Sequence, residues 1–256
     1  MIRQINLLVI CITMLSPSIA QEMADKYYDP VEMAKAREQL RNHHGGQPTF
    51  LVMGERVEYQ SHEGESLFNW DAQAWYGNDL NKFWMKSEGE YFLEEEKLEE
   101  FELQGLYSRA ISPFWDLQAG VRHDVKPDPS RTYGVIGLQG LAPYWFEIDV
   151  ASFISNKGDV SFRLEGEYEI RIRQKLILQP RIEANFSLSN DVASGIGSGV
   201  SSFEAGFRLR YEITKEIAPY LGINWSRAFG ETADIIRAEG EENENLSLVA
   251  GIRFWY

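Results

Sequence analysis

The segment Val160-Ser-Phe-Arg-Leu-Glu-Gly-Glu-Tyr-Glu-Ile-Arg-Ile172 alternates between apolar and charged residues over almost its whole length. One set of alternate positions carries Val160, Phe162, Leu164, Gly166, Tyr168, Ile170 and Ile172, and the other carries Ser161, Arg163, Glu165, Glu167, Glu169 and Arg171. Successive side chains of a strand point to opposite faces of a sheet, so a period of two predicts a strand. A strand that is apolar on one face and ionic on the other is typical of a membrane barrel, with lipid outside and water or ion pairs inside.

The same alternation recurs from Phe50 to the last residue. It predicts twelve strands, at 50–61, 67–77, 81–94, 100–111, 114–125, 132–141, 145–155, 160–172, 176–188, 200–213, 219–228 and 245–256. The predicted fold is therefore all-β, a transmembrane outer-membrane antiparallel β-barrel of about 12 strands, with 10 or 14 as alternatives. The glycine-rich segment 132–141 is the weakest of the strands. A soluble β-sandwich is the competing fold, but it does not explain the aromatic strand ends.

The connections between these strands fall into two classes. Short turns lie at 77–80, 112–113, 142–144, 174–175 and 214–216, and longer, acidic loops lie at 94–99, 126–131, 190–199 and 229–244. Outer-membrane barrels have short periplasmic turns and longer external loops. An even number of strands then places both ends of the barrel in the periplasm. The acidic loops are interpreted as solvated charge runs that could also concentrate cations.

The last strand carries a further signal. Leu246, Leu248, Ala250, Ile252, Phe254 and Tyr256 alternate with more polar or small residues, and the chain ends at an aromatic residue. Bacterial outer-membrane proteins end in this way, which supports the barrel over a sandwich.

The N-terminal region differs from the rest of the chain. Residues 1–20 are predicted to be a secretory signal peptide, because an apolar run follows Arg3 and small residues precede Gln21. Residues 21–49 are predicted to form a periplasmic segment, flexible or partly helical, with a possible helix start at Pro30 and a break over 42–48. The only cysteine, Cys11, lies in the signal, so the barrel at 50–256 offers neither disulfides nor thiolate metal ligands.

The composition narrows the possible partners. The formal net charge is −14, which gives no electrostatic basis for nucleic-acid binding and would instead attract cations. Aromatic residues make up 13% of the chain, as expected of a barrel with aromatic girdles against lipid and lipopolysaccharide. No stretch of 18 apolar residues is present, so no helical membrane span is predicted.

Several long segments resemble a known family. They are Trp70–Gly77, Leu106–Arg122, Gln139–Glu147, Leu176–Arg181, Gly195–Gly199, Leu209–Ile213, Ala218–Tyr220, Phe229–Asp234 and Ala250–Tyr256. Over roughly residues 50–256 they closely resemble the copper resistance protein B family of the Gram-negative outer membrane. The resemblance implies an outer-membrane protein that handles copper ions, with a periplasmic copper oxidase or an efflux component as a possible partner. Members of this family commonly carry a Met- and His-rich stretch before the barrel, and this chain keeps only a few such residues.

Those few residues are the first candidate metal ligands. Copper(I) favours thioether and accepts imidazole, whereas copper(II) prefers imidazole and carboxylate oxygen. His43 and His44 stand beside Gly45 and Gly46, which would let a loop fold so that both imidazoles reach one ion. Further thioethers are available from Met23, Met33 and Met53. The alternative is a solvated histidine pair without a ligand.

Two more histidines are candidates at the outer mouth. His62 lies in the predicted turn Ser61–Glu65, and His123 lies near the external end of its strand. Each stands beside a carboxylate, Glu63 or Asp124, so each could contact copper(II). A simple surface role is the alternative for both.

The charged face of the strands is the last candidate. By their phase, the side chains predicted to point inward are Asp71, Gln73, Lys82, Lys86, Glu88, Glu90, Glu102, Gln104, Asp116, Arg122, Glu147, Asp149, Arg163, Glu165, Glu167, Glu169, Arg171, Arg181, Glu183, Glu204, Arg208, Arg210, Glu212 and Arg253. They could form a cross-strand Arg–Glu network that fills the lumen, or a cation pathway.

Taken together, these features predict a non-enzymatic outer-membrane barrel that binds or translocates copper in copper resistance and homeostasis. The chain has no phosphate loop, no His-Glu-x-x-His motif and no evident nucleophile–base pair. A small porin without copper preference and a structural or adhesive barrel are the alternatives.

Overall fold

The computed structural model describes residues 24–44, 47–62 and 65–256, and it divides into one unit up to Pro48 and a second from Thr49 to Tyr256. The first unit contains a short 3₁₀ helix, η1 (Ala24–Lys26), and the helix α3 (Pro30–His44). Asp29 caps α3, since its Oδ1 accepts a hydrogen bond from the backbone N–H of Val31 at 2.8 Å. Pro30 occupies the first helical position, where its missing N–H costs nothing.

The helix ends later than the sequence predicts. The break was expected over 42–48, but α3 continues through His44. Asn42, His43 and His44 have only moderately unfavourable helix propensities, so the helix can run on until Gly45. The prediction that the two histidines lie in a loop is therefore wrong.

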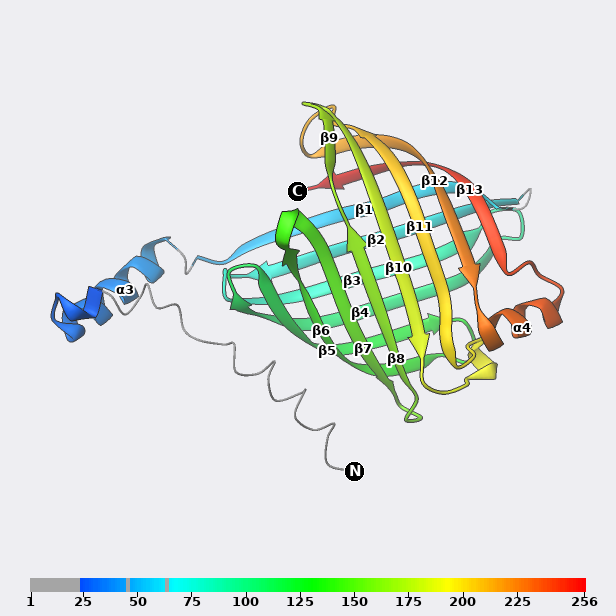
Figure 1. The fold of residues 1–256 in the computed structure, drawn as a ribbon, viewed down its shortest axis with the longest axis horizontal. Coiled ribbons are helices and arrows are strands. Elements are labelled where there is room, and N and C mark those ends of the chain that lie inside the picture. Colours follow the sequence, from blue (N-terminus) through cyan, green and yellow to red (C-terminus); the bar gives the residue numbers. More distant parts are fainter. Residues whose placement is uncertain (1–23, 45–46, 63–64) are drawn as a thin grey trace. The chain divides into compact units, whose positions relative to one another are not determined.

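The second unit is an antiparallel barrel (Figure 1). Its strands are β1 (Thr49–His62), β2 (Glu65–Gly77), β3 (Asn81–Phe92), β4 (Lys97–Ser112), β5 (Trp115–Lys126), β6 (Arg131–Ala142), β7 (Phe146–Ser155), β8 (Val160–Glu167), β9 (Ile170–Arg173), β10 (Leu176–Ser187), β11 (Gly199–Tyr211), β12 (Ile217–Ala228) and β13 (Glu244–Trp255). Both β8 and β9 pair with β10, so they share one of twelve positions. All twelve predicted strands are confirmed, including the glycine-rich one at 132–141, which pairs on both sides.

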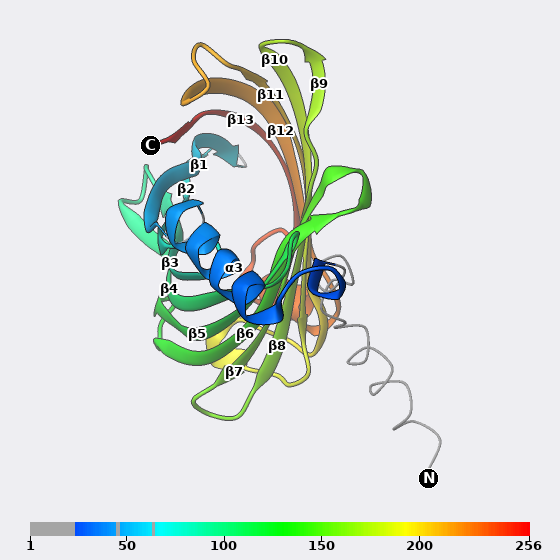
Figure 2. The ribbon, with the colours of Figure 1, turned by 90° about the vertical axis from the view of Figure 1, so that its left-hand side faces the viewer.

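The sheet closes on itself, as Figure 2 shows. Each strand pairs with the next one along the chain, except that β8 pairs with β10 instead of β9, and β1 pairs with β13 to complete the ring. Tyr256 secures this seam, because its backbone N–H donates to the Val52 carbonyl at 2.8 Å and its carbonyl accepts from the Val52 N–H at 2.9 Å. Closure leaves the main barrel without an open edge.

Burial in the barrel is the reverse of that in a soluble protein. Large apolar side chains such as Phe83, Met85 and Val121 are more than half exposed on the outside. Charged side chains such as Glu58 and Arg208 are almost fully buried inside. Lipid must cover the outer face for this arrangement to be stable, because exposed apolar surface on this scale is unfavourable in water. No helix within the described ranges has the length and apolar character needed to cross a membrane.

The two ends of the barrel differ. At one end, which we call the short-turn end, the chain segments 78–80, 113–114, 143–145, 174–175 and 212–216 connect the strands. At the opposite end, the loop end, the longer connections include the helix α4 (Gly230–Glu239) and the 3₁₀ helix η3 (Val192–Ser194). The prediction of a plain acidic loop over 229–244 is therefore wrong in part. Thr232 and Ala233 of α4 are buried, and this packing gives the segment a helix that its charge pattern hides.

Candidate functional site

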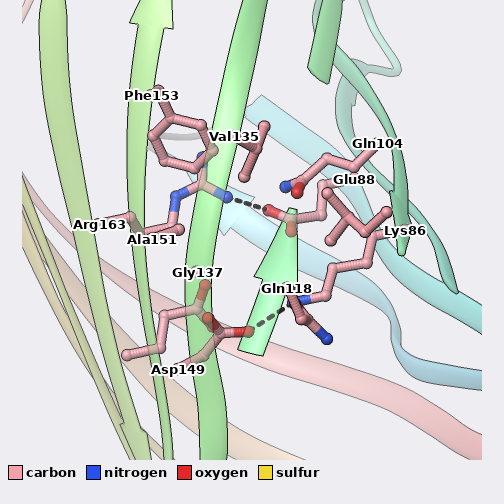
Figure 3. A pocket seen from close by; sticks show the side chains of 12 residues that line it. Lys86, Glu88, Gln104, Gln118, Val135, Gly137, Asp149, Ala151, Phe153 and Arg163 are labelled. Atoms are coloured by element: carbon pink, nitrogen blue, oxygen red, sulfur yellow. Dashed lines mark hydrogen bonds and ion pairs between the residues drawn. The ribbon is translucent and has the colours of Figure 1, made fainter. Parts of the chain in front are cut away.

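Charged side chains from opposite walls meet in the lumen of the barrel. Arg163 on β8 donates from Nη1 to Glu88 on β3 at 3.1 Å (Figure 3). It also donates from Nη2 to Glu102 on β4 at 3.0 Å. Lys86 pairs with Asp149 beside them. These contacts join strands that are not neighbours in the sheet, so they cross the lumen. The predicted Arg–Glu network is therefore present.

Arg181 is a second centre of the network. Its guanidinium contacts Glu165 at 2.9 Å, Glu183 at 2.7 Å and Glu204 at 3.1 Å. Arg56 contacts the same Glu204 at 3.4 Å. Arg181 and Arg56 thus each have more than one carboxylate partner, which offsets the loss of hydration.

Only one partner of the most buried ion pair was predicted from the sequence. Arg208 donates from Nε and Nη2 to Glu58 at 3.0 and 2.7 Å, and the Tyr220 hydroxyl donates to the same carboxylate at 2.9 Å. Arg208 is among the residues predicted to point inward, but Glu55, Arg56 and Glu58 are not. The register of β1 shifts between Gly54 and Arg56, so residues after the bulge change face. The signal was available, because two charged residues stand together at 55–56 where the apolar phase changes.

Two of the spaces between the described residues of the lumen differ greatly in size. In the middle of the barrel, a space of about 10 Å³ is lined by residues that include Lys86, Glu88 and Arg163. This is about enough room for one water molecule. Toward the short-turn end lies a cavity of about 440 Å³, which we call the vestibule. The lining of the vestibule includes the carboxylates Glu55, Asp71, Glu147, Glu165 and Glu167 and the cations Lys82, Lys86 and Arg181.

The vestibule is lined by more carboxylates than cationic side chains. Glu55 and Glu147 form neither a hydrogen bond nor an ion pair with any described residue. By contrast, Lys82 is held by Asp116 at 2.9 Å and Lys86 by Asp149, so these cations are already engaged. The vestibule therefore offers carboxyl oxygen atoms that take part in no hydrogen bond or ion pair with the described residues. Such a surface attracts cations.

The predicted ligands of the N-terminal segment do not form a cluster in the described part of the chain. Met23 lies outside the described residues. Met33 and His43 are ten residues apart on α3, and His43 is exposed. His43 and His44 are successive helical residues, and successive positions on a helix do not face each other. The helical backbone thus does not favour the two-imidazole site that a loop would allow.

The remaining predicted ligands lie on the barrel. Met53 points into the lumen, where its sulfur accepts a hydrogen bond from Arg253 Nη2 at 3.6 Å. His62 is the last residue of β1 and pairs with Glu65, so it ends a strand instead of lying in the predicted turn. His123 is exposed on the outward face beside Val121, and its Nδ1 lies 2.9 Å from Thr132 Oγ1. His123 therefore faces away from the lumen.

Arg171 also departs from its predicted place. It belongs to β9, all of whose residues are exposed. The strand is interrupted at 168–169, so β9 continues the sheet as a short piece paired only with β10. Arg171 has no ion pair among the described residues, unlike the neighbouring Glu169, which pairs with Arg210.

At the loop end, polar contacts join the connections to one another. Arg131 donates to both carboxylate oxygens of Asp191, at 2.9 and 3.2 Å. These hydrogen bonds hold the pKa of Asp191 below its ordinary value. The hydroxyl and backbone N–H of Ser198 donate to Glu231 on α4 and lower the pKa of that carboxyl as well. The loop end is thus an ordered assembly held by ionised carboxylates.

No group of three or more His, Cys, Asp or Glu side chains in the described ranges is arranged to hold a metal ion. The lumen therefore provides dispersed carboxylates and not a closed metal cage.

Comparison with known proteins identifies relatives of this chain. The family model described as Copper resistance protein B precursor (CopB) matches residues 49–256. Copper resistance protein B of Escherichia coli is 40% identical over 213 residues, which are 83% of this chain and 71% of that protein. A copper resistance protein B homolog of Pseudomonas syringae pv. tomato (strain ATCC BAA-871 / DC3000) is 40% identical over 204 residues, covering 80% and 69%.

A solved structure shares the fold. The NanC porin in a rhombohedral crystal form aligns with a TM-score of 0.54 at 15% identity, covering 80% of this chain and 99% of the porin. At this level of identity the likeness concerns the barrel alone.

Proposed function

This chain belongs to the copper resistance protein B family, and from that premise we propose that it is a non-enzymatic outer-membrane barrel that binds copper ions in its vestibule and passes them on. Family membership supports a role in copper resistance. The observation that carries the finer proposal is the vestibule itself, a cavity of about 440 Å³ with carboxylates that have no partner in the described protein.

The donor set favours one oxidation state. Carboxylate oxygen suits copper(II), whereas copper(I) prefers sulfur ligands. The thioether nearest to the lumen, Met53, contacts the Arg253 guanidinium, which would repel a metal cation. Glu55 and Glu147 are free to bind without the loss of an internal ion pair. Dispersed carboxylates hold copper(II) weakly, which suits exchange better than storage.

The orientation follows from the lengths of the connections. Short turns face the periplasm in outer-membrane barrels. We therefore place the short-turn end, with the vestibule and Thr49, on the periplasmic side. In this arrangement the vestibule receives copper from the periplasm or from a periplasmic oxidase or efflux component, and the loop end contacts lipopolysaccharide.

The direct test compares carboxylates inside and outside the vestibule. The variant Glu55→Gln with Glu147→Gln should bind less copper(II) in calorimetric titration and should not restore copper tolerance to a deletion strain. Its control is Glu241→Gln with Glu242→Gln, which removes the same charge from exposed positions. Equal copper binding and equal tolerance in the two variants would contradict the role of the vestibule.

A parallel variant separates the vestibule from the N-terminal segment. If His43→Ala with His44→Ala abolishes copper binding while the vestibule variant retains it, the segment and not the lumen is the copper site. Conductance in planar bilayers without any effect of copper, together with normal copper tolerance after deletion, would instead support a small porin. Normal tolerance without conductance would support a structural or adhesive barrel.

A further inference from the structure

A row of three oxygen-bearing side chains crosses β2, β3 and β4 near the loop end. Asn69 lies directly opposite Glu90 in the β2–β3 ladder, and Glu90 lies directly opposite Glu100 in the β3–β4 ladder. All three occupy inward positions of their strands. Like charges placed directly opposite each other destabilise a sheet, so the Glu90–Glu100 pair needs a compensating interaction.

The ion-pair network does not provide that interaction. Glu90 accepts one hydrogen bond, from Asn69 Nδ2 at 3.0 Å, and has no ion pair. Glu100 forms neither a hydrogen bond nor an ion pair with any residue that the structure describes. The cations that lie near Glu100 are Arg122 and Arg163, and both are bound to Glu102. The pair therefore differs from Glu88 and Glu183, which are held by arginine.

Asn69 adds an independent observation. Its side chain is only 7% exposed, and its Oδ1 has no hydrogen-bond partner. Because Nδ2 of the same amide contacts Glu90, the amide lies against that carboxylate, and its oxygen has no hydrogen-bond partner there. Burying a carbonyl oxygen without a hydrogen-bond partner is energetically unfavourable. One ligand that accepts electron pairs from all three side chains would remove this cost and the charge repulsion together.

We propose that Asn69, Glu90 and Glu100 form a binding site for a hard divalent cation of the Ca²⁺, Mg²⁺ and Mn²⁺ class. Two carboxylates and an amide carbonyl are the oxygen ligands that these ions prefer, and no imidazole or sulfur takes part. Glu100 is exposed to the lumen, so water can complete the coordination shell. The site is separate from the vestibule, which lies in the opposite half of the barrel, and it does not depend on the copper proposal.

Few charged ligands imply weak binding. Oxygen sites with few carboxylates in extracellular modules bind Ca²⁺ with dissociation constants of about 10⁻⁴–10⁻³ M, and we expect the same range here. In this proposal an ion reaches the site from the loop end, on the side of the barrel opposite the vestibule. Bound there, it would tie β2, β3 and β4 together across the lumen face.

The experiment uses Mn²⁺ as a paramagnetic probe of the full-length protein, refolded in an uncharged detergent free of lipopolysaccharide. Free Mn²⁺ is measured by electron paramagnetic resonance during titration, and Ca²⁺ is added as a competitor. Glu90→Gln with Glu100→Gln should weaken Mn²⁺ binding at least tenfold. The matched control, Glu95→Gln with Glu96→Gln, removes the same charge from the exposed turn between β3 and β4 and should bind as the wild type does.

Substitutions of Asn69 keep the test independent of the two glutamates. Asn69→Leu should weaken Mn²⁺ binding, and Asn69→Asp, which adds a third carboxylate, should tighten it about tenfold. A correctly folded wild type that binds no more Mn²⁺ than the double glutamine variant would overturn the proposal and would indicate that the two glutamates share a proton. Tighter binding of Mn²⁺ by Asn69→Asp would support the site even if the double variant fails to fold.

Discussion

The Arg208–Glu58 pair and the vestibule lie in the same lumen, but the carboxylate of the pair has bonded partners and some carboxylates of the vestibule have none. Glu58 is 1% exposed, and its carboxylate accepts hydrogen bonds from Arg208 and Tyr220. In the vestibule, Glu55 lies only three residues away along β1 but has no hydrogen-bond or ion-pair partner in the described structure. The bulge in β1 lets Glu55 and Glu58, which are three residues apart, both face the lumen.

This difference suggests separate roles for the carboxylates of the lumen, one in stability and one in metal binding. A buried carboxylate with a complete set of donors is fixed, and removal of its partner leaves an uncompensated charge. A carboxylate that faces a cavity can keep its water and can exchange that water for a metal ion. The Arg208–Glu58 pair is therefore expected to stabilise the barrel, and the unpaired carboxylates of the vestibule are expected to bind copper(II).

The strongest test of this contrast is Arg208→Met. The change leaves the buried Glu58 without its cationic partner, so we expect the free energy of unfolding to fall by about 3–5 kcal/mol. Urea unfolding of the refolded barrel, followed by tryptophan fluorescence, measures the loss. The double variant Glu58→Leu with Arg208→Met removes both charges and should recover most of it. A small loss of unfolding free energy in the single variant would mean that water hydrates the Arg208–Glu58 pair. The pair would then not differ from the carboxylates of the vestibule.

The barrel could be predicted from the sequence because its signal is local. Alternation of lipid-facing and lumen-facing residues is dictated at every strand, so all twelve strands and most inward charges were recognised from segments such as Val160–Ile172. The family resemblance, carried by long unusual segments, was confirmed as well. The β8–β9 interruption was not foreseen, because the alternation continues across it.

Features that depend on one irregular residue or on partners far apart in sequence were not predictable. The bulge at Gly54–Arg56 moves Glu58 to the inner face, and its partner Arg208 is 150 residues away. The helix α4 depends on contacts of Thr232 with Gly197. For the copper ligands predicted from the sequence, the residue types of His43 and Met53 were suitable, but only the fold shows that His43 lies on a helix and Met53 beside Arg253.

A smaller effect is expected at the loop end, where pairing occurs outside the membrane. Arg131 lowers the pKa of Asp191, so this pair stabilises the folded state fully above the ordinary aspartate pKa of 3.8. The contribution is lost as the pH falls through the lowered pKa of the folded state. Asp191→Asn should thus reduce the free energy of unfolding by about 1 kcal/mol at pH 6. The difference from the wild type should shrink in urea unfolding as the pH falls below 3.8, and a difference that persists unchanged at lower pH would show that Asp191 acts through something other than its charge.

The smallest effect on stability is expected in the vestibule. Glu55→Gln with Glu147→Gln breaks no ion pair, so the free energy of unfolding should change by no more than about 0.5 kcal/mol. The sign should be toward stabilisation, since Glu55 lies within electrostatic reach of Asp71 and Glu167 and the substitution relieves repulsion between carboxylates. Urea unfolding measures this value on the same protein samples that are titrated with copper(II). A loss of several kcal/mol would show that these carboxylates support the fold, and unpaired carboxylates would then not mark the binding path of the copper ion.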